Sequence, residues 1–237
     1  MKRTLTLLFG IGCLLYAASD TPQKIQIAKT EQADLPSGGA VRLKNSTGEL
    51  TIEGWDRPGV EITTLKSTKR AYPATGAERE KASHILDEVK VSAALQGNEL
   101  VITTDFPRDR RWLPRPSVGA RDFDLEYIVK VPRGAKVTVD HDAGEIHFVE
   151  LTGDIRAMMN QGAITLQLPA AAQYSIDAQS RIGDVTSDFP GTTFRRHFGH
   201  SFIQTTPAPH SLYLRTGYGD IIILRSSKPA PLPTPSL

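Results

Sequence analysis

The sequence predicts an all-β protein built as a single-stranded parallel β-helix, or β-solenoid, and three observations lead to this fold class. An aliphatic or aromatic residue returns every nine positions through residues 137–224. Glycine and one further residue precede many of these positions, as in Gly144-Glu145-Ile146 and Gly219-Asp220-Ile221. The only cysteine, Cys13, lies near the N-terminus, so the rest of the chain must be held together by something other than disulfides.

The repeat divides into two alternating sets of positions. The ten positions are Val137, Ile146, Ile155, Ile164, Ile176, Val185, Phe194, Ile203, Leu212 and Ile221, with one three-residue slip after Ile164. Every second position follows a glycine turn, with Ser201 in place of glycine in one unit, and most of the others follow a proline turn. One coil is therefore about 18 residues long and holds two short strands. Stacked coils would bury their apolar faces together, and glycine suits corners that need a positive φ or close packing.

Residues 1–19 are predicted to be a secretory signal peptide. Lys2 and Arg3 precede a short apolar run, and Ala17-Ala18-Ser19 provides small residues for cleavage. The apolar run is too short to span a bilayer, so no transmembrane span is expected in the mature chain. Lipoprotein anchoring at Cys13 is not expected, because Gly10 stands where such signals usually carry leucine. The predicted location is the periplasm, the cell surface or the extracellular space.

The remaining elements are predicted in chain order. Residues 20–40 form an extended N-terminal arm, and a single β-solenoid domain covers residues 41–224. It starts with a strand pair around Gly48-Glu49, because apolar residues alternate on both sides of that turn. Residues 74–122 are an insertion with a helix, a hairpin and a basic loop, and residues 123–131 form a strand. Residues 225–237 form a disordered, proline-rich tail.

The insertion contains the one predicted helix. Thr75 and Glu78 have the spacing of a capping box. Ala82, Ile85, Leu86 and Val89 then fall on one helical face. This apolar stripe could lie on a sheet or close one end of it.

Composition and motifs limit the function classes. The formal net charge is +2, so nothing points to nucleic acid. The acidic positions of the repeat could suggest calcium, but each turn offers a single carboxylate, whereas calcium needs six to eight oxygens. These positions are Glu49, Glu145, Asp154, Asp184 and Asp220. We therefore interpret them as solvated turn residues.

Two further groups are weighed in the same way. Asp140, Asp142, Glu145 and His147 could act on a polysaccharide, but they flank one turn and alternate in direction. His197, His200 and His210 lie in adjacent units, but the first two have opposite strand parity. We interpret both groups as ordinary solvent-exposed side chains without a chemical role. No catalytic residue, metal site or cofactor is predicted.

The basic loop at residues 107–121 is the predicted binding site. Its candidate residues are Arg108, Arg110, Arg111, Trp112 and Arg115. Arginine and tryptophan contribute strongly at interfaces, and arginine binds phosphate or carboxylate in bidentate fashion. The predicted partner is an anionic envelope component, such as a lipid headgroup, a polysaccharide or an acidic protein. The alternative is an insertion without a binding role, in which Trp112 packs back on the sheet.

Several of these motifs together resemble the bacterial "putative adhesin" domains of unknown function. The resemblance rests on the segment from Val41 to Asp56, on Val131-Pro132-Arg133-Gly134-Ala135 and on the repeated glycine-acid-isoleucine turns. It covers residues 41–224 and implies a β-helix or β-roll in the cell envelope, with no established enzymatic activity.

The sequence thus favours an exported, non-enzymatic envelope protein that presents an adhesin-like binding surface. One alternative is a structural or stress-related envelope accessory protein that acts by self-association or through a protein partner. A more remote alternative is a β-helix enzyme that acts on polysaccharide.

Overall fold

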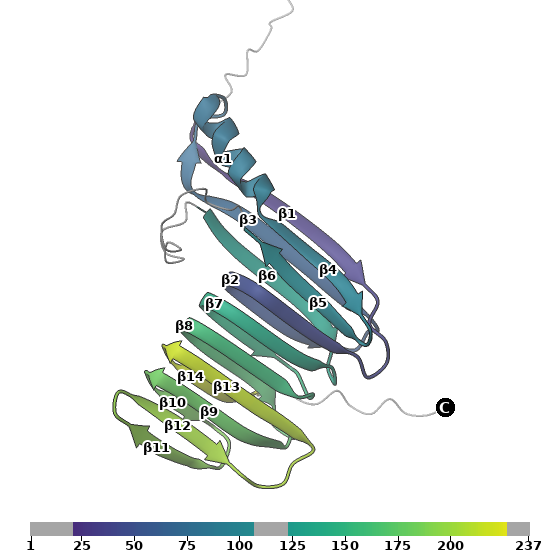
Figure 1. Cartoon of the computed structure of the whole chain (residues 1–237), viewed down its shortest axis with the longest axis vertical. Helices are drawn as coiled ribbons and strands as arrows, with labels where there is room; N and C mark the ends of the chain where they lie inside the picture. Colours follow the sequence, from purple (N-terminus) through teal and green to yellow (C-terminus); the bar gives the residue numbers. More distant parts are fainter. Residues whose placement is uncertain (1–20, 107–122, 227–237) are drawn as a thin grey trace, which may run out of the picture.

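The computed structural model describes residues 21–106 and 123–226, and it is all-β with one helix, as predicted (Figure 1). The elements are β1 (Gln23–Ala33), β2 (Ala40–Trp55), β3 (Val60–Tyr72), α1 (Ala77–Glu88), β4 (Lys90–Gln96), β5 (Glu99–Asp105), β6 (Phe123–Pro132), β7 (Lys136–Val149), β8 (Ile155–Pro169), β9 (Tyr174–Ile182), β10 (Val185–Ser187), β11 (Thr192–Arg196), β12 (Gly199–Gln204), β13 (His210–Tyr218) and β14 (Ile221–Ser226). All these strands join one 14-stranded mixed sheet. The predicted signal peptide lies outside the described residues.

The long central strands bend at a glycine, which gives each repeat two walls. In β7 the buried side chains are Val137, Val139 and His141 before the bend, then Ile146 and Phe148 after it. The alternation changes phase at the glycine between them, whose φ is 129°. Both halves of the strand therefore point their apolar side chains toward one interior, and these side chains belong to one hydrophobic core cluster.

In the centre of the sheet, the strand registers pair residues that occupy corresponding positions of the nine-residue period. On one wall Val137 pairs with Ile155, which pairs with Leu212, which pairs with Ile176, all in parallel strands. On the other wall the corresponding chain of pairs is Ile146, Ile164, Ile221 and Val185. The nine-residue period thus identified residues that lie at the same level of the stack.

The repeats do not stack in chain order. The last repeat, β13 with β14, lies between the repeat of β8 and the repeat of β9 with β10. Equivalent positions carry similar residue types in most repeats, with exceptions such as Ser201 in place of glycine. The period therefore predicts which residues share a level, but it leaves open which repeats are neighbours.

A parallel β-helix running through residues 41–224 is not shown, because the sheet is mixed. The units of Phe194 and Ile203 form the antiparallel hairpin β11–β12, and β12 is also antiparallel to β9. Phe194 was predicted to face the core, but its side chain is 48% exposed. The reason is local. Only His197 and Phe198 separate the two strands, and so short a connection can join only antiparallel strands.

The opposite end of the sheet is also antiparallel. The strands β1, β3 and β6 pair antiparallel to one another, and the second half of β2 joins β6 to β7 in parallel. The first half of β2 pairs with β5, which carries β4 as an antiparallel neighbour. Within the predicted extended arm, residues 23–33 form β1, and the predicted tail begins with the last two residues of β14.

Helix α1 lies alongside β1 and β3 at that end (Figure 1). Its buried residues Ala82 and Leu86 form a small cluster with Ile25 of β1. The predicted capping box is wrong, because Gly76 is the N-cap residue and no side chain caps the N-terminus of the helix. None of the described helices is long and apolar enough to cross a membrane.

Candidate functional site

The predicted binding residues Arg108, Arg110, Arg111, Trp112 and Arg115 lie outside the described residues. Their role stays a prediction. The other predicted candidates can be placed, and the described part of the chain also brings together a group of residues that the sequence did not single out.

Four of the five acidic positions of the repeat form two separate pairs, and the fifth lies at another turn. Glu49 and Glu145 are directly paired on neighbouring strands, and the carboxylate of Asp220 accepts a hydrogen bond of 2.8 Å from the backbone N–H of Asp184. Asp154 lies at the other turn, where it accepts hydrogen bonds from the N–H and hydroxyl of Ser211. Within residues 21–106 and 123–226, no three His, Cys, Asp or Glu residues are grouped as a metal ion would require.

The carboxylates weighed for polysaccharide chemistry are divided by the bend of β7. Asp140 and Asp142 line a groove on one side of the bend, and Glu145 lines a different groove. Asp140 is paired with Arg42 at 3.3 Å, and Asp142 accepts a hydrogen bond of 2.9 Å from Asn160. His147 lies with Nε2 3.3 Å from a carboxylate oxygen of Glu145, away from the two aspartates. The structure therefore does not gather all four residues into one site.

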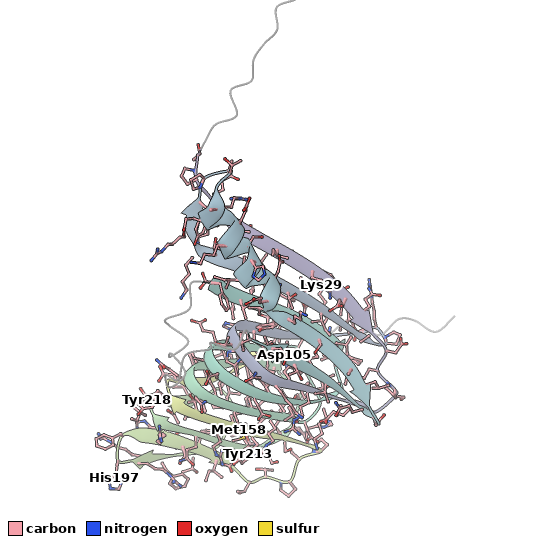
Figure 2. The ribbon with its side chains drawn as sticks, turned by 45° about the horizontal axis from the view of Figure 1, so that its top comes forward. Lys29, Asp105, Met158, His197, Tyr213 and Tyr218 are labelled. Atoms are coloured by element: carbon pink, nitrogen blue, oxygen red, sulfur yellow. The ribbon has the colours of Figure 1, made fainter. Side chains whose placement is uncertain are left out.

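The three candidate histidines also have separate surroundings. His200 Nδ1 lies 2.8 Å from a carboxylate oxygen of Asp184. His210 lies 4.0 Å from Asp154 and packs against the ring of Tyr174. His197 lies in the turn of the β11–β12 hairpin (Figure 2). His200 and His210 thus lie beside different carboxylates.

The residues that the structure brings together lie on β8, β13 and β9. We call them the arginine–tyrosine face: Arg156, Met158, Arg181, Tyr213, Arg215 and Tyr218. Arg156 pairs with Tyr213 and Met158 pairs with Arg215 across the parallel strands β8 and β13. These positions alternate with buried core residues, so their side chains point away from the core. Figure 2 shows Met158 and Tyr213 close together on this part of the sheet.

Ring contacts hold this face in place. The guanidinium carbons of Arg156 and Arg215 lie 4.2 Å and 4.0 Å from the ring centroid of Tyr213. Arg181 lies 5.1 Å from the ring centroid of Tyr218. Arg215 is also fixed by Asp177, with an ion pair of 2.6 Å. Stacking and ion pairing leave these arginines fewer conformations, so a partner that binds them loses less side-chain entropy.

The charges of the face are not fully balanced. Arg215 has a carboxylate partner, but in the described part of the chain Arg156 and Arg181 have none. Both can therefore offer guanidinium N–H groups to an anionic group of a partner. Met158 is 41% exposed and Tyr218 is 51% exposed, so apolar surface lies beside these cations. This combination of arginine, tyrosine and methionine is typical of interface cores.

An open groove of about 790 Å³ follows the face. Its lining includes Met158, Arg181, Arg215 and Tyr218, the amide side chains of Asn160 and Gln179, and the carboxylates of Asp140 and Asp142. A second groove, of about 630 Å³, runs along the glycine corners. Its lining includes Glu49, Glu126 and Glu145, so the two grooves differ in charge.

Sequence reasoning missed the arginine–tyrosine face for a topological reason. Arg156 and Tyr213 each follow the first apolar residue of their repeat, so the period places them at one level of the stack. They become neighbours because the last repeat is inserted beside β8, and the period does not encode that insertion.

Comparison with solved structures gives a similarity of fold. A putative cell adhesion protein from Clostridium sporogenes aligns with a TM-score of 0.51 and 11% identity, over 85% of this chain and 100% of that chain. A putative adhesin from Bacteroides fragilis aligns with a TM-score of 0.25 and 9% identity, over 86% of this chain and 99% of that chain. At such low identity the first similarity shows fold alone, and the second carries no further conclusion. No protein-family model and no curated protein matches the chain.

Proposed function

We propose that the chain is an exported, non-enzymatic envelope protein that acts as an adhesin-like binding module through the arginine–tyrosine face. The proposal rests on two arginines, Arg156 and Arg181. Each stacks on an exposed or half-buried tyrosine, and neither arginine has a carboxylate partner within the described residues. The partner is an anionic component of the envelope. The fold shared with a putative cell adhesion protein supports the broad class.

We also propose that the parallel centre of the sheet is a short β-solenoid. Its support is the register between β7 and β8. Each paired residue of β7 lies opposite the residue of β8 that is one predicted coil length further along the chain, as Val137 lies opposite Ile155. A stack of hydrogen-bonded strands around one core is a rigid support for a flat binding face. Rigid support matters because an arginine that is already oriented binds with a smaller entropic loss.

The absence of enzymatic activity is part of the proposal and has its own support. The carboxylates of Asp140 and Asp142 are held by Arg42 and Asn160, and Glu145 lies in the other groove. General acid–base chemistry on a glycoside needs two carboxyl groups that face one bond. Turnover of an envelope polysaccharide that is lost in Asp142→Asn would contradict the proposal.

The test is binding of the mature protein to envelope material with and without two substitutions, Arg156→Gln and Arg181→Gln. Interface arginines often contribute about 2 kcal/mol or more, so we expect the double variant to bind at least ~30-fold more weakly. Arg70→Gln is the matched control, because Arg70 is an exposed arginine on β3, far along the sheet from this face. Equal binding by the double variant and the wild type would remove the face from the proposal.

A further inference from the structure

The hairpin β11–β12 exposes large apolar side chains at the end of the sheet. Phe198 is 79% exposed and Phe194 is 48% exposed, and every residue of β11 is exposed. Figure 1 shows β11 as the last strand of the stack, at the end opposite α1. Phe202 and Phe189 at the same end are buried, with 4% and 6% exposure. The core therefore has its own phenylalanines, and the two exposed rings are additional to it.

The local fold does not require phenylalanine at the tip. His197 and Phe198 form a two-residue hairpin turn, and neither residue has a positive φ, so the turn does not demand a particular residue at either position. A small polar residue there would serve the turn and avoid the exposure of an aromatic ring to water. A large ring kept at such a tip is explained by a contact outside the chain.

The hairpin is also strongly cationic. Residues 189–219 contain no aspartate or glutamate, although the whole chain has 26 acidic residues. Arg195 and Arg196 lie directly between the two exposed phenylalanines, and His197 follows them. Both arginines are exposed and, within the described residues, neither has an ion-pair partner.

We propose that this hairpin docks the protein on the surface of an anionic phospholipid bilayer. The ring of Phe198 enters the boundary between headgroups and acyl chains, Phe194 follows it, and Arg195 and Arg196 contact lipid phosphates. Aromatic rings are favoured at this depth of a bilayer, and each cation near an anionic surface adds to the attraction. The inference rests on the proposed export, because an envelope protein faces a membrane, but it uses residues outside the arginine–tyrosine face.

Charge and shape favour a bilayer over a second copy of the chain. If two β11 strands paired edge to edge, Arg195 and Arg196 of both copies would come together, and like charges on neighbouring strands repel. A projecting tip with one large ring offers little area for a protein interface. It suits a soft surface that admits a single side chain and presents many phosphates.

The experiment is co-sedimentation of the mature protein with vesicles made of equal parts phosphatidylglycerol and phosphatidylcholine, and with vesicles of phosphatidylcholine alone. We expect binding to the mixed vesicles that decreases as salt is raised. Phe198→Ser should weaken partitioning by roughly tenfold or more, because it removes the burial of one aromatic ring. Replacement of Arg195 and Arg196 by glutamine should weaken it about fivefold for each charge. Phe198→Trp should retain binding, and its fluorescence should shift to shorter wavelength with vesicles.

Leu95→Ser and Arg70→Gln are the matched controls. Leu95 is 50% exposed on β4 and Arg70 is exposed on β3, both away from the hairpin, so these variants should bind vesicles like the wild type. Thermal unfolding should be unchanged in all variants, since the replaced side chains are exposed.

Vesicle binding that survives both Phe198→Ser and the arginine variants overturns the proposal, as does phenylalanine-dependent self-association without vesicle binding. Loss of vesicle binding in the hairpin variants with retained binding to other envelope material supports docking and leaves the arginine–tyrosine face intact.

Discussion

At the scale of single residues, the glycines at the bends determine how closely the repeats stack. They form a continuous series in the order Gly48, Gly144, Gly162, Gly219 and Gly183, each with a positive φ. A Cβ on Gly162 would overlap the carbonyl oxygen of Gly144, and a Cβ on Gly219 would overlap that of Gly162. The backbone of one repeat thus occupies the space where the next repeat would carry a side chain.

We expect Gly162→Ala to destabilise the protein by about 3 kcal/mol or more, because it adds an unfavourable φ to a clash with backbone atoms. Urea unfolding followed by circular dichroism measures this loss. Gly134→Ala is the control, since a Cβ there meets nothing within 4 Å and the φ of Gly134 is not in the left-handed region. It should change stability by less than about 0.5 kcal/mol. Equal effects of the two substitutions would contradict the role given to the bend.

The buried His141 makes folding sensitive to acid. Its Nε2 lies 3.1 Å from the carbonyl oxygen of Gly48 and must donate to it, so Nδ1 accepts from the hydroxyl of Ser46 at 2.8 Å. Burial lowers the pKa of His141 from 6.5 to about 4. The unfolded chain therefore takes up a proton at His141 as the pH falls below about 6.5, while the folded chain stays neutral there until the pH nears 4. The stabilisation is complete above pH 6.5 and is lost progressively as the pH falls through this window.

We expect the free energy of unfolding to fall by about 2 kcal/mol between roughly pH 7 and pH 5 through this residue alone. Urea unfolding at the two pH values measures the change. His141→Gln is the comparison, because it removes the titrating group and should flatten much of the pH dependence. An NMR titration that places His141 near the ordinary histidine pKa would refute this account.

At the scale of elements, some features followed from the sequence and others did not. The shared level of Ile155 and Leu212, which pair in parallel strands, was predictable. Both residues belong to the nine-residue series of apolar positions that forms one buried wall. The β11–β12 hairpin was not predictable, since Phe194 and Ile203 match the period although a two-residue turn forces antiparallel pairing. The arginine–tyrosine face forms because β13 lies beside β8. This neighbour was not predictable, because other stacking orders of the repeats would place similar residues side by side.

The end of α1 is capped by a side chain from the sheet. Lys66 of β3 donates hydrogen bonds of 2.7 Å and 3.0 Å to the carbonyl oxygens of Leu86 and Val89. Desolvation by burial is the main cause that lowers the pKa of Lys66. Nothing in the sequence indicates this contact, because Lys66 lies 20 residues before Leu86 in the chain.

We expect Lys66→Met to destabilise the protein by about 1–2 kcal/mol, because it leaves two helix carbonyls without this donor. Hydrogen exchange should locate the effect in α1, and urea unfolding should give its size. Lys24→Met is the control, since Lys24 is an exposed lysine of β1. A uniform loss of protection over the whole sheet, with α1 no more affected than β7, would argue against a capping role.

At the scale of the whole molecule, the two ends of the sheet are finished in different ways. One end carries α1 against β1 and β3, and the other carries the cationic hairpin β11–β12 (Figure 1). Edge strands tend to pair with other chains unless they are covered or charged. The β11 edge is charged, and α1 packs against Ile25 near the start of the other edge strand, β1. Both features bear on the choice between a binding module and a self-associating accessory protein.

We expect residues 20–237, the chain without its predicted signal peptide, to remain monomeric at micromolar concentration, because β11 carries Arg195 and Arg196 and α1 lies at the opposite end. Light scattering over a range of concentrations measures this. Arg195→Ser with Arg196→Ser removes the repulsion at one edge, and this variant should associate more readily than the wild type at low salt. A wild-type mass that grows steadily with concentration would instead favour the accessory protein, since open growth requires both ends to accept another copy. A fixed monomer mass leaves the exposed arginines and phenylalanines free for a partner of a different kind.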